Sequence, residues 1–189
     1  MGARLKKALK ITGIAAGGLF LAVTAVGLCL PQTVHIERSI VVTGTPEDVY
    51  PFIASFKTGW SQWSPFQDEK ANLQVQFSGP ETGVGAAQRW DSEEMGDGHM
   101  EITKADPRSG VSFDLVLMHD SYRLNGSLIC EPAETGTKVT WTDDIPYGAN
   151  PYRRYLGLVV RKPLGDAFEK GLGTLKTKVE AKAVTAPKS

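Results

Sequence analysis

The stretch "KPLGDAFEKGLGTLKTKVEAK", residues 162–182, predicts an amphipathic helix around which the rest of the chain must pack. Apolar residues recur through it every three or four positions, which is the spacing of one face of an α-helix. That stripe is formed by Leu164, Phe168, Leu172, Leu175 and Val179. An amphipathic helix must bury its stripe against another element. Pro163 should break or kink the helix, so residues 150–162 are expected to form a separate turn or helix.

The same stretch carries three glycines, each of which costs a helix about 1 kcal/mol relative to alanine. Gly171 lies at one edge of the apolar stripe, and Gly165 flanks the stripe on its other side. In these places the missing side chain lets another backbone approach or leaves a hollow beside the helix. Gly173 points away from the stripe, and its presence is not explained in this way.

A series of strand-like segments offers the surface that the helix needs. In residues 110–120 every second residue from Val111 to Leu117 is apolar, as on a half-buried strand. Short turns such as "MGDG", residues 95–98, separate the segments and predict antiparallel neighbours. The predicted strands cover residues 34–44, 72–79, 84–94, 98–107, 110–120, 122–132 and 137–148.

Two short helical segments are expected between the first strand and the second. Thr45 can cap a helix in "TPEDVYPFIASF", residues 45–56, and Pro46 suits its first position. The second is "GWSQWSPF", residues 59–66. The fold class is therefore α+β, with an antiparallel sheet of six or seven strands curled around one long C-terminal helix in a helix grip.

Four motifs follow one another through this domain. They are "SIVVTGTPEDVYPFIASFKTGWSQWSPF" at residues 39–66, "GPETGVGAAQRWDSEEMGDGHMEIT" at 79–103, "GTKVTWT" at 136–142 and "NPYRRYLGLVVRKPLGDAFEKGLGTLK" at 150–176. In this order they resemble polyketide cyclase/dehydrase-type members of the START-like (SRPBCC) superfamily. The resemblance covers residues 34–182 and implies the helix-grip fold with an internal cavity for apolar ligands. Because that superfamily includes lipid carriers, cyclases and hormone receptors, the resemblance does not decide the function.

Residues 11–30 contain no charge and are long enough, as a helix, to span a bilayer. The basic cluster in residues 1–10 should stay in the cytoplasm, which puts the C-terminal domain outside, in the periplasm or the extracellular space. A cleaved signal peptide is the alternative, and a lipoprotein signal that uses Cys29 is a third interpretation. Gly13 and Gly17 form a GxxxG spacing that can bring two such helices together in a weak homodimer.

Composition limits the possible partners of the chain, which has 189 residues. Its formal net charge is zero, which argues against a nucleic-acid partner. The two cysteines and three histidines lack metal-ligand spacing, so no metal and no cofactor is expected. The expected organisation is a basic N-terminus at 1–10, a transmembrane helix at 11–30, a START-like domain at 34–182 and a disordered tail at 183–189.

A cavity for an apolar ligand should be lined by flat aromatic rings and by the inward faces of the strands and the helix. His119 continues the apolar parity of its strand, so it is the candidate acid–base group; His99, which starts a strand, is expected to be exposed. The expected lining residues are Trp60, Trp63, Trp90, Phe113, Leu115, Leu117, Trp141, Leu164, Phe168 and Leu172.

Two neighbouring carboxylates belong to the last predicted strand. Asp143 shares the face of Trp141, whereas Asp144 should look outward. A buried carboxylate needs a partner, and Arg89 or Arg123 could supply one.

Three functions are compatible with this pattern. The first is a membrane-anchored domain that binds a hydrophobic small molecule or lipid in its cavity. The second is a polyketide-cyclase-like or hydrolase enzyme acting on an apolar substrate, with His119 as its acid–base group. The third is a structural partner in an envelope complex, with a collapsed cavity.

Overall fold

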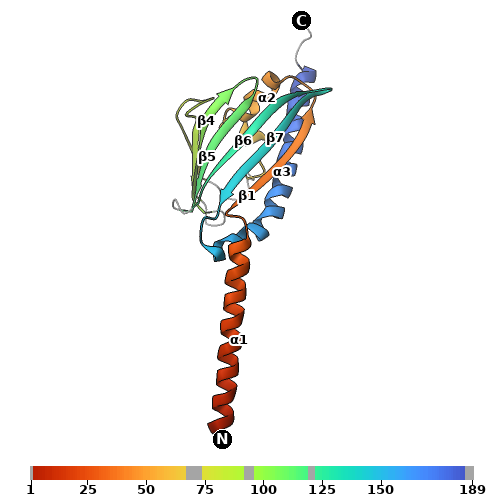
Figure 1. Ribbon diagram of the computed structural model, residues 1–189. Coiled ribbons are helices and arrows are strands. Elements are labelled where there is room, and N and C mark those ends of the chain that lie inside the picture. Colours follow the sequence, from red (N-terminus) through yellow and green to blue (C-terminus); the bar gives the residue numbers. More distant parts are fainter. Residues whose placement is uncertain (1, 67–73, 92–95, 119–121, 186–189) are drawn as a thin grey trace.

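The computed structural model describes residues 2–66, 74–91, 96–118 and 122–185. Figure 1 shows a curved sheet with one long helix across it and a second long helix projecting from one end. The helices are α1 (Gly2–Cys29), α2 (Pro46–Ile53), the short 3₁₀ helix η1 (Trp60–Gln62) and α3 (Pro151–Thr185). The strands are β1 (Thr33–Val42), β2 (Gln74–Ser78), β3 (Ala87–Asp91), β4 (Gly98–Asp106), β5 (Gly110–Leu117), β6 (Tyr122–Ala133) and β7 (Gly136–Pro146).

The described strands form one antiparallel sheet in the order β1-β7-β6-β5-β4-β3-β2. Strands β2 to β7 are therefore a meander of neighbours, as the short turns predict, and β1 adds to the edge of β7. The predicted α+β helix-grip class is confirmed, with seven strands and with α2 and η1 as the two short helices after β1. Each predicted strand overlaps an observed one, because period-two alternation marks both.

The apolar stripe of α3 packs on the sheet. Phe168, Leu172, Leu175 and Val179 are fully buried. A side chain at Gly171 would meet Pro65 at 2.8 Å and Trp141 at 3.2 Å, while one at Gly165 would overlap the Arg38 guanidinium. These two glycines therefore let β1, β7 and the segment after η1 approach the helix closely. Gly173 faces open space, so the packing gives no reason for it.

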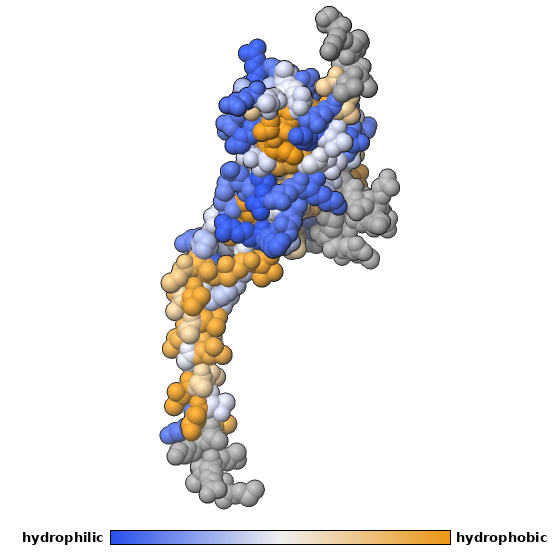
Figure 2. Space-filling model, turned by 90° about the vertical axis from the view of Figure 1, so that its right-hand side faces the viewer, coloured by the Kyte–Doolittle hydropathy of each residue, from blue (hydrophilic) through white to orange (hydrophobic). Residues whose placement is uncertain are grey.

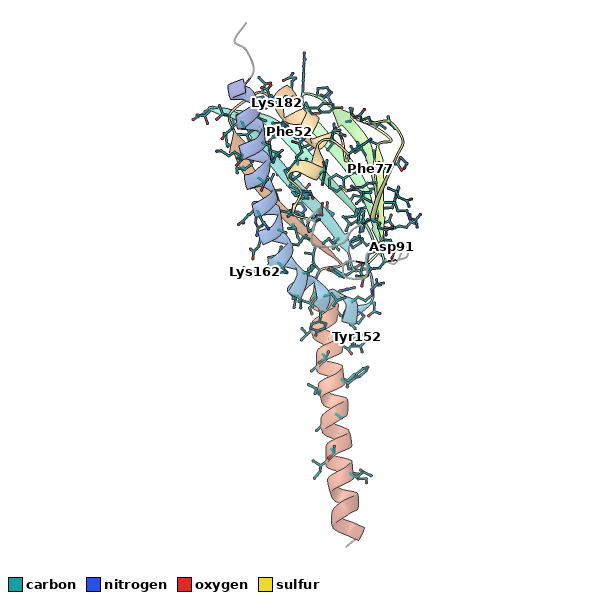
Figure 3. All side chains as sticks on the ribbon, turned by 180° about the vertical axis from the view of Figure 1, so that it is seen from behind. Phe52, Phe77, Asp91, Tyr152, Lys162 and Lys182 are labelled. Atoms are coloured by element: carbon teal, nitrogen blue, oxygen red, sulfur yellow. The ribbon has the colours of Figure 1, made fainter. Side chains whose placement is uncertain are left out.

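The expectation that residues 150–162 form a separate turn or helix is wrong, whereas the expected kink is present. The helix runs without interruption from Pro151 to Thr185, with Pro163 inside it. Figures 1 and 3 show that the turns before Lys162 run in a different direction from the rest. Proline removes one helical hydrogen bond and crowds the preceding turn, which bends a helix that tertiary contacts hold together. The last four residues of the predicted tail, 186–189, lie outside the described residues.

Helix α1 extends away from the domain. Its segment Leu9–Cys29 is long and apolar enough to cross a membrane, a test that a signal sequence near an N-terminus also meets. Side chains along this segment are almost all exposed. Figure 2 shows their apolar surface in orange, below a domain whose visible face is mainly polar around one apolar patch.

The first turns of α3 hold the end of α1. The guanidinium of Arg154 is buried, and its Nη1 donates to the carbonyl oxygens of Leu28 at 2.9 Å and Leu30 at 3.1 Å. The Tyr155 hydroxyl donates to the carbonyl oxygen of Val23 at 2.7 Å. Carbonyl groups at a helix C-terminus have no partner within the helix, and a cation is favourable there. This junction fixes the direction in which α1 leaves the domain.

Candidate functional site

A cavity of about 550 Å³ lies between the sheet and the first half of α3. Its walls come from β3 to β7, from the segment that follows α2 and from α3 between Leu156 and Leu164. The strands supply the side chains of one face only, because alternate residues of a strand point to opposite sides. The large side chains of α3 and the sheet do not meet here, and an internal hollow remains.

Seven of the ten residues expected to line a cavity lie along this one: Trp60, Trp90, Phe113, Leu115, Leu117, Trp141 and Leu164. The other three, Trp63, Phe168 and Leu172, are buried in the solid core beside it. The Trp63 indole N–H donates to the carbonyl oxygen of Phe52 at 2.8 Å, and the Phe168 ring stacks on Trp141 at 4.1 Å. Contact of the seven with a ligand stays a prediction.

Several lining residues escaped the sequence analysis although a signal for them exists. Ile145 shares strand parity with Trp141, and Leu124 alternates in step with Leu128 on its own strand. Leu156 and Val160 continue the α3 stripe at intervals of four residues upstream of Leu164. The expected break at Pro163 concealed this continuation, since residues 150–162 were expected to form a separate element.

Asp143 is a carboxyl group inside this apolar cavity. It faces inward like Trp141, as strand parity predicts, and its side chain is 5% exposed. It fits because Gly126 lies opposite on β6, where any side chain would overlap the carboxyl oxygen and the Phe113 ring. Burial raises the pKa of Asp143 to about 8, with the neighbouring charge of Asp144 adding to the shift and the Trp141 indole N–H opposing it. The group is therefore mainly protonated at neutral pH.

The expected arginine partner of this carboxyl is not found among the described residues. Arg89 and Arg123 have exposed side chains and stand next to inward-facing residues on their strands, so they point to the other face. Within the described part of the chain, neither Oδ1 of Asp143 nor Nε1 of Trp141 makes a hydrogen bond of normal geometry, although the indole N–H lies close enough to the carboxyl to lower its pKa. Two polar atoms inside the cavity therefore keep bonding capacity for another group.

The histidine candidates do not contribute to the described cavity wall. His119 lies outside the described residues, as does Asp120. His99 stands on β4 with its side chain 42% exposed, 3.7 Å from Glu101, as expected for an exposed residue. Among the described lining residues, Asp143 is the carboxylic acid available for proton transfer.

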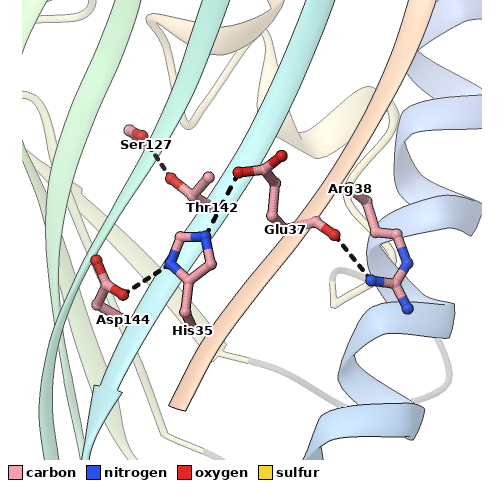
Figure 4. A network of polar contacts seen from close by, with 6 residues as sticks. All are labelled: His35, Glu37, Arg38, Ser127, Thr142 and Asp144. Carbon is pink, nitrogen blue, oxygen red and sulfur yellow. Dashed lines mark hydrogen bonds and ion pairs between the residues drawn. The ribbon is translucent and has the colours of Figure 1, made fainter. Parts of the chain in front are cut away.

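The opposite face of β7 is polar and exposed (Figure 4). The Asp144 carboxylate contacts Nδ1 of His35 at 2.8 Å, and Glu37 contacts Nε2 at 3.4 Å. These bonds raise the pKa of His35, with Asp144 as the larger cause. Ser127 and Thr142 share a hydrogen bond of 2.7 Å on the same face. The adjacent aspartates of β7 therefore differ in environment: Asp143 is desolvated inside the cavity, whereas Asp144 faces water.

Comparison with known proteins supports this architecture. A family model described as polyketide cyclase/dehydrase and lipid transport matches residues 33–180. No protein with a curated function shows significant similarity in sequence.

Solved structures share the fold at low sequence identity. A protein of unknown function from Staphylococcus aureus is 13% identical with a TM-score of 0.61, over 81% of this chain and 97% of that one. The di-domain aromatase/cyclase StfQ of the steffimycin biosynthetic pathway is 11% identical with a TM-score of 0.60, over 82% of this chain and 53% of StfQ. DynU16, a putative protein in the dynemicin biosynthetic locus, is 16% identical with a TM-score of 0.50, over 78% of this chain and 48% of DynU16. The chain thus spans about half the length of StfQ and DynU16.

The family model covers most of the chain, including β1, the whole sheet and nearly all of α3. The fold and the cavity between sheet and helix agree with that match. The chain belongs to the polyketide cyclase/dehydrase and lipid transport family, as a START-like domain with a ligand-binding architecture.

Proposed function

We propose that this protein is a membrane-anchored binding domain that holds a hydrophobic small molecule or lipid in the cavity between its sheet and α3. The observation that carries the proposal is the cavity itself, about 550 Å³ in volume and lined mainly by aromatic and aliphatic side chains. Sites for small ligands in proteins usually measure about 300–1,000 Å³ and have this kind of lining. A collapsed interior, as expected of a purely structural partner, would leave no such space.

The position of the cavity relative to α1 supports ligand exchange at a membrane surface. Leu156 and Val159 line the cavity, yet they are 47% and 73% exposed, so they belong to its mouth. They follow directly on Arg154 and Tyr155, which bind the end of α1. A bilayer that contains α1 would therefore lie close to this opening.

Apolar surface also continues from α1 across the base of the domain (Figure 2). Tyr152, labelled in Figure 3 beside the end of α1, is 44% exposed and shares a hydrogen bond of 2.8 Å with Thr24. Tyrosine is favoured at membrane interfaces because its ring is apolar and its hydroxyl is polar. Leu158, also on this part of α3, is 61% exposed.

The proposed organisation follows from these features. Residues 1–10 would lie in the cytoplasm, residues 11–30 would span the membrane, and the binding domain at 34–182 would lie outside, in the periplasm or the extracellular space. Cleavage of the N-terminal segment as a signal peptide is the alternative. Gly13 and Gly17 face open space in the single chain, which is compatible with the suggested weak helix dimer.

The test is to purify the full-length protein in a mild detergent and to identify apolar molecules that co-purify with it by native mass spectrometry. We expect one bound hydrophobic molecule per chain. Leu115→Trp fills the cavity and should remove that molecule, whereas Val116→Trp on the opposite face of β5 should retain it. Equal amounts of bound molecule in both variants, or none in the native protein, would contradict the proposal.

A second candidate is an enzyme acting on an apolar substrate, and one observation favours it: a protonated carboxyl, Asp143, stands in the cavity. A general acid needs its proton at the working pH. Asp143→Asn removes the exchangeable acid and keeps the shape. If the protein is an enzyme, the molecule recovered from this variant will differ in mass from the one recovered from the native chain. Identical molecules would support binding alone.

A further inference from the structure

Two unsatisfied polar atoms inside the cavity indicate the chemistry of its ligand. Trp141 and Asp143 lie two residues apart on β7, so both side chains point to the same side of the sheet. They are 2% and 5% exposed, and both line the cavity. Neither the indole Nε1 nor the carboxyl Oδ1 makes a hydrogen bond of normal geometry among the described residues, although the indole N–H lies close enough to the carboxyl to lower its pKa. Buried polar atoms in native proteins are nearly always bonded, so a missing partner calls for an explanation.

Neither side chain is free to turn away from the cavity. The Trp141 ring is stacked on Phe168 at 4.1 Å and meets the edges of Trp60 and Trp63 at 5.6 and 5.4 Å. The Asp143 carboxyl occupies the space that the absent side chain of Gly126 leaves open. The indole N–H and the carboxyl are therefore held in place before any ligand arrives.

Both groups are hydrogen-bond donors in the state expected at neutral pH. An indole nitrogen can only donate. A carboxyl that remains protonated also donates, through its O–H. No Lys, Arg or His is present among the described residues that line the cavity. An anionic head group would therefore lack a countercharge at this depth, which makes its burial unfavourable.

We infer that Trp141 and Asp143 form a polar anchor that binds an uncharged oxygen, a hydroxyl or a carbonyl, at the inner end of an otherwise apolar ligand. The ligand class is thus a neutral amphiphile such as a long-chain alcohol or ketone, bound with its oxygen inside and its hydrocarbon toward the mouth. This inference rests on the proposed binding function and adds the ligand's polar group and orientation.

The test compares four probes of equal chain length on the delipidated full-length protein in detergent micelles: dodecane, 1-dodecanol, dodecanoic acid and dodecylamine. Occupancy is measured by native mass spectrometry. We expect the native protein to favour dodecanol over dodecane by about tenfold or more, which is what one buried hydrogen bond is worth. Asp143→Leu should abolish this preference and still bind dodecane. Trp141→Phe should reduce the preference, and Asp114→Asn, an exposed carboxylate on β5, should leave it unchanged.

Asp143→Asn distinguishes loss of the polar anchor from loss of the folded structure. Its side-chain amide still donates a hydrogen bond, and it does not ionise at any pH in the test. In this variant the preference for dodecanol should persist from pH 6 to pH 9.5. In the native protein it should weaken above about pH 8, where Asp143 ionises. The other titratable groups on the described cavity wall, Tyr122 and Tyr147, are phenols; burial and Tyr122 raise the pKa of Tyr147. The charge of Asp144 acts from the opposite face.

The possible outcomes are distinct. An equal preference for dodecanol in the native protein and in Asp143→Leu would mean that Asp143 does not bind the oxygen of the ligand, and it would overturn the inference. So would a preference for dodecanoic acid or for dodecylamine. Failure of all four probes to bind would instead count against the proposed binding function.

Discussion

Replacing Asp143 by asparagine should make the stability of this protein less sensitive to pH. The folded chain holds the pKa of Asp143 at about 8, compared with 3.8 for a free aspartate. A raised acid pKa means that the folded state keeps its proton while the unfolded state has released it. Stability is therefore fully present below about pH 4 and is lost progressively as the pH rises through 8.

The magnitude follows from the two pKa values. Each pKa unit corresponds to about 1.4 kcal/mol, so the difference of about four units amounts to roughly 5 kcal/mol above pH 8. Asparagine has nearly the same shape and carries no charge. The variant and the native protein should thus be similarly stable near pH 4, and the variant should be more stable by roughly 4 kcal/mol at pH 7.

The assay is urea denaturation of the full-length, delipidated protein in micelles at a series of pH values from 4 to 9, with the free energy of unfolding obtained by linear extrapolation. Asp114→Asn, at an exposed carboxylate on β5, is the matched control for the same chemical change outside the cavity. A native-minus-variant difference for Asp143→Asn that stays constant across this range would refute the reasoning, because it would mean that the carboxyl is solvated or paired.

Three further predictions concern α3, the α1 junction and the outer face of the sheet. Gly171→Ala should lower the free energy of unfolding by about 1–3 kcal/mol, because the added methyl group overpacks the contact with Pro65 and Trp141. Gly173→Ala faces open space and should raise the free energy of unfolding by up to about 1 kcal/mol. Urea denaturation compares the two variants, and equal effects would show that helix propensity alone sets the stability change. Arg154→Met should leave the last carbonyl groups of α1 without their arginine donor and speed amide hydrogen exchange in residues 23–30 at least tenfold. Unchanged exchange would mean that the arginine does not hold the junction. NMR titration should place the pKa of His35 above 6.5 in the native protein and lower it in Asp144→Asn. The stability that His35 contributes is therefore present below pH 6.5 and is lost as the pH rises through the folded pKa. The same His35 pKa in both proteins would exclude this pairing.

Local periodicity accounts for what could be predicted. Every second residue of β5 is apolar, and the α3 stripe repeats every three or four residues, so the type and order of these elements can be recognised without coordinates. The same parity correctly separates Asp143 from Asp144. Pro163 does not end the helix, because the preference of proline to end a helix is local, whereas contacts of α3 with the sheet and with α1 keep the helix continuous.

Local patterns in the sequence are enough to predict an antiparallel sheet packed around a C-terminal helix, preceded by an apolar segment, because alternation, helical spacing and turn residues are properties of neighbours along the chain. Which inward-facing residues border empty space and which fill the core depends on how the folded elements meet. Trp141 and Phe168 both occupy inward-facing positions of their periodic patterns, yet Trp141 reaches the cavity while Phe168 packs behind it. How deeply a side chain is buried, and which groups lie beside Asp143, depend on contacts between segments that are far apart in the sequence. No local pattern of residues records those contacts.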